Sequence, residues 1–230
     1  MLDTDWSDSW RGAFRIELRA EAIGFAWRGW PVLPGTYPTN SIPANSSEAA
    51  QSNEPQCGDH RWAGRAGHEE HGPVPIRQDW TEHLGATPDQ IAEWWSGHPY
   101  SLLVATGSAV DAIEVDDQLG RRAARALRVT GQPVPIVATP NGRWLFLTAP
   151  GTSPEPALHK QAGVTWHGMG SWVPLPPTPF EHGVVHWRVK PDVWGWQLPT
   201  AHVVHAALLG AISSQKAAVA SAQRLVAAEA

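Results

Sequence analysis

The chain has 230 residues, enough for one large domain, and 42% of them are hydrophobic, which excludes global disorder. The formal net charge of -5 leaves no overall basic field, so nucleic-acid binding would depend on a local patch. The single cysteine, Cys57, excludes an internal disulfide framework, and the acidic N-terminus lacks the apolar core of a signal peptide. No stretch reaches the roughly 20 apolar residues of a membrane span, so we expect a cytoplasmic protein that does not contact membranes.

The first third of the chain predicts a helix, a strand and a long loop. Residues 10–30 carry two apolar stripes at spacings of three and four, which predicts a helix buried on more than one side. A short strand bounded by prolines is expected over residues 29–34. Residues 35–72 are rich in Ser, Asn and Pro and then in His and Gly, which predicts a mobile loop within a single domain spanning 1–230.

The middle of the chain carries clear start and stop signals. Thr87 and Gln90 form the pattern of a capping box with Pro88 between them, which predicts a helix that starts there. Asn141 and Gly142 predict a hairpin turn, because both residue types tolerate positive φ. Strands are expected over 101–106, 112–115, 136–138, 144–148, 164–166, 172–173 and 184–189, and helices over 117–130 and 200–230, the last with a break near 212–214. Such a mixture without strict alternation favours the α+β class.

Two acidic residues stand at the end of one predicted strand. Glu114 and Asp116 are two residues apart, and the period of a strand places both carboxylates on one face. Carboxylates at this spacing can hold Mg²⁺ or Mn²⁺, as two-metal phosphoryl-transfer sites require. Acidic residues at strand ends are also common on ordinary protein surfaces, so the spacing by itself is a weak signal.

A series of short motifs gives the acidic pair a context. AWRGWPVLP, TPDQIAEWWSGHP, ATGSAVDAIEVDDQLG, ATPNGRWLFL and GVTWHGMGSWVPLPPT follow one another between residues 23 and 178. In this order they resemble the bifunctional primase/polymerase (prim-pol) domain of the archaeo-eukaryotic primase superfamily. The resemblance implies a central mixed or antiparallel sheet flanked by helices, and a DNA replication chemistry that joins nucleotides with divalent metal ions.

The same resemblance shows where catalytic positions have changed. The family's D-x-D motif corresponds to Glu114 and Asp116, which would be the catalytic metal ligands. The family's triphosphate-binding histidine corresponds to Trp144, its third carboxylate to Thr165, and its arginine to His167. Losing a metal ligand and a phosphate contact typically costs orders of magnitude in rate.

Three hypotheses follow from these changes. The first is a catalytically reduced domain that binds nucleotide or nucleic acid, with Asn141, Arg143 and His167 as nucleotide-binding residues, and that either acts alone or works with a separate replication partner. The second is an active metal-dependent nucleotidyltransferase with an atypical ligand set. The third is a non-catalytic protein-interaction module that has kept only the fold.

The histidine-rich stretch suggests a second metal. Cys57, His60, His68 and His71 are spaced C-x2-H-x7-H-x2-H, and four such ligands in two close pairs can hold Zn²⁺ tetrahedrally. The alternative is an ordinary surface loop in a chain with 11 histidines.

The 14 tryptophans can serve base stacking or core packing. Trp27, Trp30, Trp94 and Trp95 are predicted to lie in the core.

Arg121, Arg125 and Arg128 share one face of the helix predicted after the acidic pair. The default interpretation of this stripe is a solvated helix face, and the alternative is a surface that contacts phosphate groups.

Overall fold

The computed structural model describes residues 5–38, 62–65, 72–153 and 155–228. The chain divides into two compact units, which we describe separately: Met1–Ala105 with Pro174–Val185, and Thr106–Val173 with His186–Ala230. Both units combine helices with antiparallel strands, which confirms the predicted α+β class. In the described part of the chain, no helix combines the length and the apolar character that a membrane span needs.

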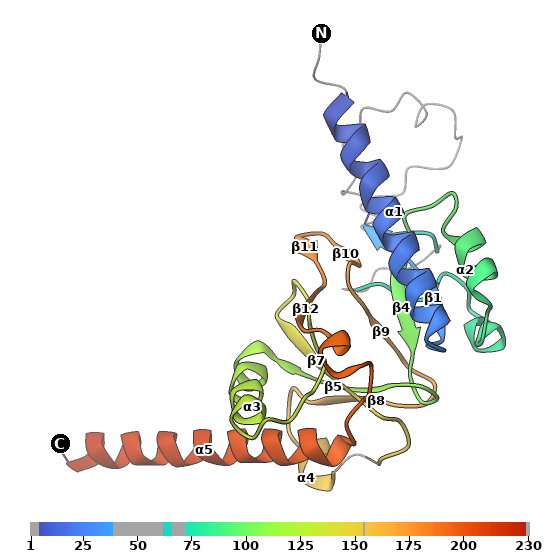
Figure 1. Ribbon diagram of the computed structural model, residues 1–230. Helices are drawn as coiled ribbons and strands as arrows, with labels where there is room; N and C mark the ends of the chain where they lie inside the picture. Colours follow the sequence, from blue (N-terminus) through green and yellow to red (C-terminus); the bar gives the residue numbers. More distant parts are fainter. Residues whose placement is uncertain (1–4, 39–61, 66–71, 154, 229–230) are drawn as a thin grey trace. The chain divides into compact units, whose positions relative to one another are not determined.

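The first unit is built on a pair of helices and short strand pairs (Figure 1). Two helices, α1 and α2, pack together, and the strands β1 and β4 pair antiparallel with Val32 opposite Val104. The elements are α1 (Asp5–Trp27), β1 (Val32–Gly35), β2 (Tyr37–Pro38), β3 (Trp62–Ala63), the 3-10 helix η2 (Trp80–His83), α2 (Pro88–Trp94), β4 (Ser101–Ala105), β10 (Pro179–Phe180) and β11 (Gly183–Val184).

One apolar stripe of α1 is buried and the other is not. Leu18, Ala22 and Phe25 are at most 1% exposed. Ile16 and Trp27, from the second stripe, are 71% and 75% exposed. The prediction of burial on two sides, and of Trp27 in the core, is therefore wrong: a helix that packs through a single face buries one stripe, whatever the residues on the opposite face.

The helix α2 starts as its sequence predicts. The Thr87 hydroxyl accepts a hydrogen bond from the Gln90 N–H (3.3 Å), and the Gln90 side chain accepts one from the Thr87 N–H (2.9 Å). Pro88 occupies the first turn, where its missing N–H has no partner to lose. Just past the helix, Trp95 is 3% exposed, and Trp30 is 6% exposed, so these two tryptophans lie in the core as predicted.

The second unit contains a five-stranded antiparallel sheet in the order β12-β6-β7-β5-β8. Strands β6 and β7 form the predicted hairpin, and β5 pairs with both β7 and β8. The elements are β5 (Asp111–Asp116), α3 (Asp117–Val129), β6 (Ile136–Ala138), β7 (Arg143–Thr148), α4 (Pro156–His159), β8 (Thr165–His167), β12 (His186–Val189), the 3-10 helix η3 (Pro191–Trp194) and α5 (Ala201–Ala228). The strand β9 (Trp172–Pro174) spans the point where the chain leaves this unit.

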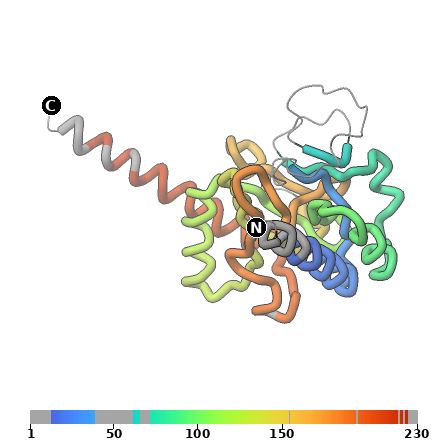
Figure 2. The backbone as a smooth tube through the Cα atoms, turned by 90° about the horizontal axis from the view of Figure 1, so that it is seen from above, coloured from blue at the N-terminus to red at the C-terminus, as the bar shows by residue number. Residues whose placement is uncertain are grey.

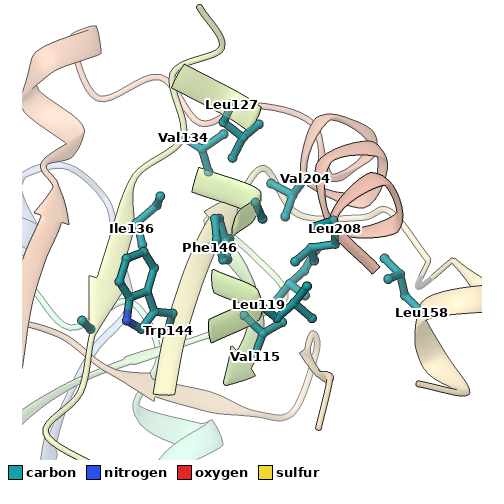
Figure 3. Close-up of a cluster of buried hydrophobic side chains, with 14 residues drawn as sticks. Val115, Leu119, Leu127, Val134, Ile136, Trp144, Phe146, Leu158, Val204 and Leu208 are labelled. Carbon is teal, nitrogen blue, oxygen red and sulfur yellow. The ribbon is translucent and has the colours of Figure 1, made fainter. Parts of the chain in front are cut away.

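The sheet packs one face against α3 and α5. Val115 from β5 and Phe146 from β7 join Leu119 of α3 and Val204 and Leu208 of α5 in one buried cluster (Figure 3). Burying each large apolar side chain stabilises the fold by roughly 1.5–3 kcal/mol. Because side chains alternate along a strand, the residues between those of the cluster lie on the sheet's other face. This alternation places the polar residues described below.

The helix α5 is continuous from Ala201 to Ala228, so the predicted break near 212–214 is wrong. The Ser214 hydroxyl donates back to the Gly210 carbonyl (2.9 Å), which satisfies this polar side chain inside the helix. Beyond this point α5 runs past α3 (Figures 1 and 2), and residues 213–218 are exposed.

His205 makes the stability of the second unit depend on pH. The residue is 4% exposed, its ring lies against Trp166, and neither ring nitrogen has a hydrogen-bond partner among the described residues. Burial, with a smaller contribution from His202, lowers its pKa from the usual 6.5, against an opposing effect of Glu155. Protonation is thus easier in the unfolded chain, and stability falls as pH drops below about 6.5.

We predict that His205→Leu flattens this dependence. Thermal melts between pH 7.5 and 5 should show a smaller loss of melting temperature in the variant than in the wild type. The exposed His186 gives a matched control, and His186→Gln should keep the wild-type slope. Equal slopes in wild type and His205→Leu would contradict the account.

Candidate functional site

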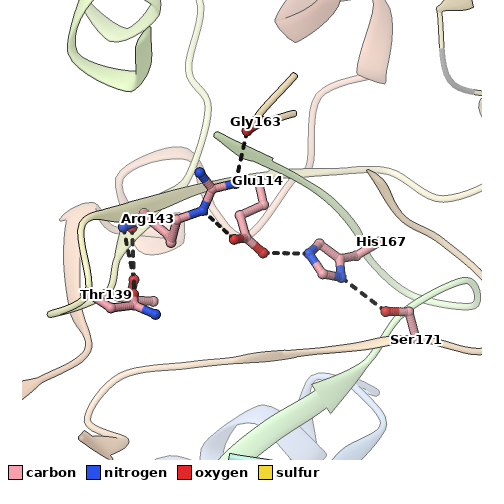
Figure 4. A network of polar contacts seen from close by, with 7 residues as sticks. Glu114, Thr139, Arg143, Gly163, His167 and Ser171 are labelled. Carbon is pink, nitrogen blue, oxygen red and sulfur yellow. Dashed lines mark hydrogen bonds and ion pairs between the residues drawn. The ribbon is translucent and has the colours of Figure 1, made fainter. Parts of the chain in front are cut away.

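Glu114 lies at the centre of a polar network on the sheet face that points away from α3 and α5 (Figure 4). Arg143 Nε donates to Glu114 Oε1 at 2.5 Å, and His167 Nε2 lies 2.7 Å from Glu114 Oε2. Glu114 comes from β5, Arg143 from β7 and His167 from β8, and each side chain is at most 25% exposed. Both oxygens of the carboxylate are therefore engaged by nitrogen donors from the two neighbouring strands.

The partners of Glu114 decide its protonation state. Burial alone would raise its pKa, but hydrogen bonds and charge from His167 and Arg143 outweigh burial, so the pKa lies below its ordinary value. A carboxylate only accepts hydrogen bonds, so His167 donates from Nε2. Its Nδ1 lies 3.0 Å from the Ser171 hydroxyl, which can donate to a neutral ring or accept from a charged one.

The hairpin turn positions Arg143. The Thr139 hydroxyl accepts from the Arg143 N–H (3.2 Å) and donates to the Asn141 side chain. Of the Asn-Gly pair, only Gly142 has a positive φ (77°). The Arg143 side chain then reaches across the strands, and its Nη2 donates to the Gly163 carbonyl (2.9 Å) just before β8. The turn and the strand entry together fix the guanidinium beside Glu114.

A glycine fixes the loop that carries Ser171. Gly107 has a φ of 104°, and an added Cβ would lie 2.4 Å from the Met169 Cα. Next to it, the Thr106 hydroxyl donates to the Gly168 carbonyl (2.5 Å), and the Thr106 N–H donates to the Ser171 carbonyl (2.9 Å). These contacts hold the loop close enough for Ser171 to reach His167.

Asp116 has a different role from Glu114. It is the N-cap of α3, and its Oδ1 accepts from the Leu119 N–H at 2.9 Å. A carboxylate in this position satisfies an unpaired backbone donor and interacts favourably with the helix dipole. The two acidic residues share a strand end, as the sequence predicts, but they hold different partners.

Strand register locates the positions that the sequence resemblance selects. Thr165 lies directly opposite Glu114 across β5 and β8, and Arg143 lies opposite Asp116 across β5 and β7. Trp144, by contrast, is 6% exposed within the cluster under α3. Neighbours in a strand point to opposite faces, so Arg143, and not Trp144, lies on the face of Glu114.

Comparison with known proteins agrees with this arrangement. The family model described as bifunctional DNA primase/polymerase, N-terminal, matches residues 22–202. The chain belongs to this prim-pol family. No curated protein and no solved structure gives a significant match. Membership indicates a function of the DNA primase/polymerase kind, in a family whose members typically use divalent metal ions.

The structure brings together four of the residues that the prim-pol resemblance selects. Glu114, Arg143 and His167 are in contact, and Asn141 joins them through Thr139. The predicted zinc ligands, Cys57, His60, His68 and His71, lie outside the described residues.

Three residues of the network were not predicted from the sequence. Thr139, Gly163 and Ser171 contribute a hydroxyl, a carbonyl and a hydroxyl. Thr139 precedes a recognisable turn, where such hydroxyls often hydrogen-bond nearby backbone, so this signal was available. Nothing local marks Gly163 or Ser171, because their contacts depend on the strand register.

We predict that Glu114→Gln lowers the free energy of unfolding by about 1–3 kcal/mol at pH 7, because the Arg143 and His167 contacts lose their charge. The lowered pKa means that this stabilisation is present above about pH 4.5 and is lost as pH falls further. Urea denaturation should therefore show the gap between wild type and variant closing from pH 6 to pH 3. Glu93→Gln, on the exposed face of α2, is the control, and a gap that does not depend on pH would contradict the ion pairing.

Proposed function

We propose that this prim-pol domain binds a nucleoside triphosphate beside Arg143 and supports little or no nucleotidyl transfer. The observation that carries the proposal is the pairing of both Glu114 oxygens with Arg143 and His167. A divalent ion on Glu114 would stand next to a guanidinium. Two like unit charges 4 Å apart repel by roughly 4 kcal/mol near a protein surface, and a doubly charged ion is repelled more strongly.

The remaining donors do not make up for this repulsion. Asp116 is engaged in capping α3, and Thr165, opposite Glu114, is neutral. Among the described residues, no group of three or more His, Cys, Asp or Glu side chains is placed to share an ion. Two-metal catalysis clamps the attacking and leaving oxygens between cations held by several carboxylates. This donor set does not fit such a centre, so we derive no transfer step through it.

The same residues favour an anionic ligand. Arg143 uses Nε and Nη2 in the contacts described above, which leaves Nη1 as a donor on a side chain that is 25% exposed. The neighbouring Asn141, in the turn, is exposed. Charge-assisted hydrogen bonds from a guanidinium to phosphate oxygens are among the stronger polar contacts in proteins. Nucleotide binding can therefore persist where the metal chemistry has been lost.

We predict that Glu114→Gln tightens triphosphate binding three- to tenfold in the presence of EDTA, because Arg143 is then no longer neutralised by a carboxylate. Anisotropy of a fluorescent nucleoside triphosphate analogue measures this change. Arg143→Ala should weaken the same binding about tenfold or more. If Glu114→Gln instead weakens binding, and does so only when Mn²⁺ is present, Glu114 is a metal ligand and the proposal fails.

We also predict no template-dependent product in primer-extension and dinucleotide-synthesis assays with Mn²⁺ or Mg²⁺. The reason is that Arg143 and His167 engage both oxygens of Glu114 and that Asp116 has only one oxygen outside its cap contact, which is too few ligands for a pair of catalytic ions. A product that depends on the template and disappears in Asp116→Ala would identify an active enzyme with an atypical ligand set.

A further inference from the structure

Arginines line a groove on the helix side of the second unit. The groove has a volume of about 500 Å³ and lies between α3, the loop that follows it, and β12. Its basic lining consists of Arg121, Arg125 and Arg128 from α3 and Arg188 from β12, with Trp144 of β7 also in the lining. The four arginines are exposed, whereas Trp144 is buried.

Trp144 holds arginines on both sides of the groove. The Arg188 guanidinium lies 5.1 Å from the Trp144 ring centroid, and that of Arg121 lies 6.0 Å from it. Cations over an indole face at such distances are held by the ring's electrostatic field. Gly120 lets the indole pack against α3, since an added Cβ there would lie 2.9 Å from the Trp144 side chain. The two walls are therefore tied to one buried side chain.

The charge of the groove is not neutralised from within. Among the residues that the structure describes, none that lines the groove is acidic. Arg121 pairs with Asp117 at 2.9 Å, but Arg125, Arg128 and Arg188 have no ion-pair partner among the described residues. In a chain of net charge -5, this concentration of positive charge favours a ligand with several negative charges.

We propose that this groove binds the sugar-phosphate backbone of a single-stranded nucleic acid. From Arg121 to Arg128 the helix rises about 10 Å, so its cations face a row of phosphates better than one phosphate group. The volume of about 500 Å³ is in the range of pockets that hold small ligands, so we expect the groove to take part of one strand rather than a duplex. Because the indole of Trp144 is only 6% exposed, it offers no stacking platform, and the contacts are directed to phosphates and independent of base sequence.

This site is distinct from the proposed triphosphate site. Arg143 lies on the sheet face of Glu114, whereas its neighbour Trp144 lies on the face covered by α3. The groove binds through residues that take no part in the Glu114 network. Each proposal can therefore fail without the other.

The test is binding of a fluorescein-labelled 20-nucleotide oligo(dT), measured by anisotropy between 25 and 200 mM NaCl. Arg125→Ala/Arg128→Ala should weaken binding at least tenfold at 25 mM NaCl. It should also reduce the slope of log affinity against log salt by about 1.4, since each single-strand phosphate contact contributes about 0.7. Lys160→Ala/Arg224→Ala removes the same charge from exposed positions of the same unit and should change the affinity less than threefold.

Further binding measurements distinguish among the possible ligands. Oligo(U) of the same length should bind like oligo(dT), and a duplex of the same length should bind more weakly. Binding of the triphosphate analogue should be unchanged in Arg125→Ala/Arg128→Ala, so that a failure of the triphosphate site is recognised separately. Arg188→Ala, on the opposite wall, should weaken oligonucleotide binding as well. Equal effects of the two double variants, tighter binding of the duplex, or no oligonucleotide binding at 25 mM NaCl would overturn the proposal.

Discussion

The contact of Glu114 with Arg143 and His167 joins the three strands β7, β5 and β8 through charged hydrogen bonds. Its consequences extend in two directions. Structurally, it needs the turn at Thr139, the carbonyl of Gly163 and the hydroxyl of Ser171, so that the hairpin and two loops are fitted to one carboxylate. Chemically, it supplies both oxygens of the acidic residue with donors from the protein itself, one of which is the Arg143 guanidinium.

The alternating side chains of β7 separate two surfaces of the second unit, the sheet face of Glu114 and the face covered by α3. Arg143 extends to the face of Glu114, and the next residue, Trp144, extends into the cluster beneath α3. There Trp144 packs on Gly120 and lies under Arg188. The change from a histidine to a tryptophan that the family resemblance indicates therefore concerns the groove side of the sheet. On the other side, the hairpin places the Arg143 guanidinium beside Glu114.

Local signals in the sequence were sufficient where short-range chemistry determines structure. The capping box at Thr87, the turn ending in Gly142 and the strand that ends at Asp116 are all present as expected. The prediction failed where tertiary packing decides which face of a helix is buried. The exposed stripe of α1, with Ile16 and Trp27, has the same periodicity as the buried stripe.

The candidate site shows the same division. The order of the motifs indicated the family and selected Glu114, Arg143 and His167. It did not indicate that these residues bind one another, because their contacts depend on how β5 registers with its two neighbours. Spacing alone also suggested equivalent roles for Glu114 and Asp116. The start of α3 directly after the strand gives Asp116 a backbone partner instead.

The most direct test is a double-mutant cycle of Glu114→Gln and Arg143→Met, with free energies of unfolding measured with and without 5 mM Mn²⁺. An ion pair that belongs to the fold predicts a coupling free energy of about 1 kcal/mol or more that Mn²⁺ leaves unchanged. A coupling near zero, or one that disappears when Mn²⁺ is added, would show that Glu114 serves a metal ion and would contradict the account.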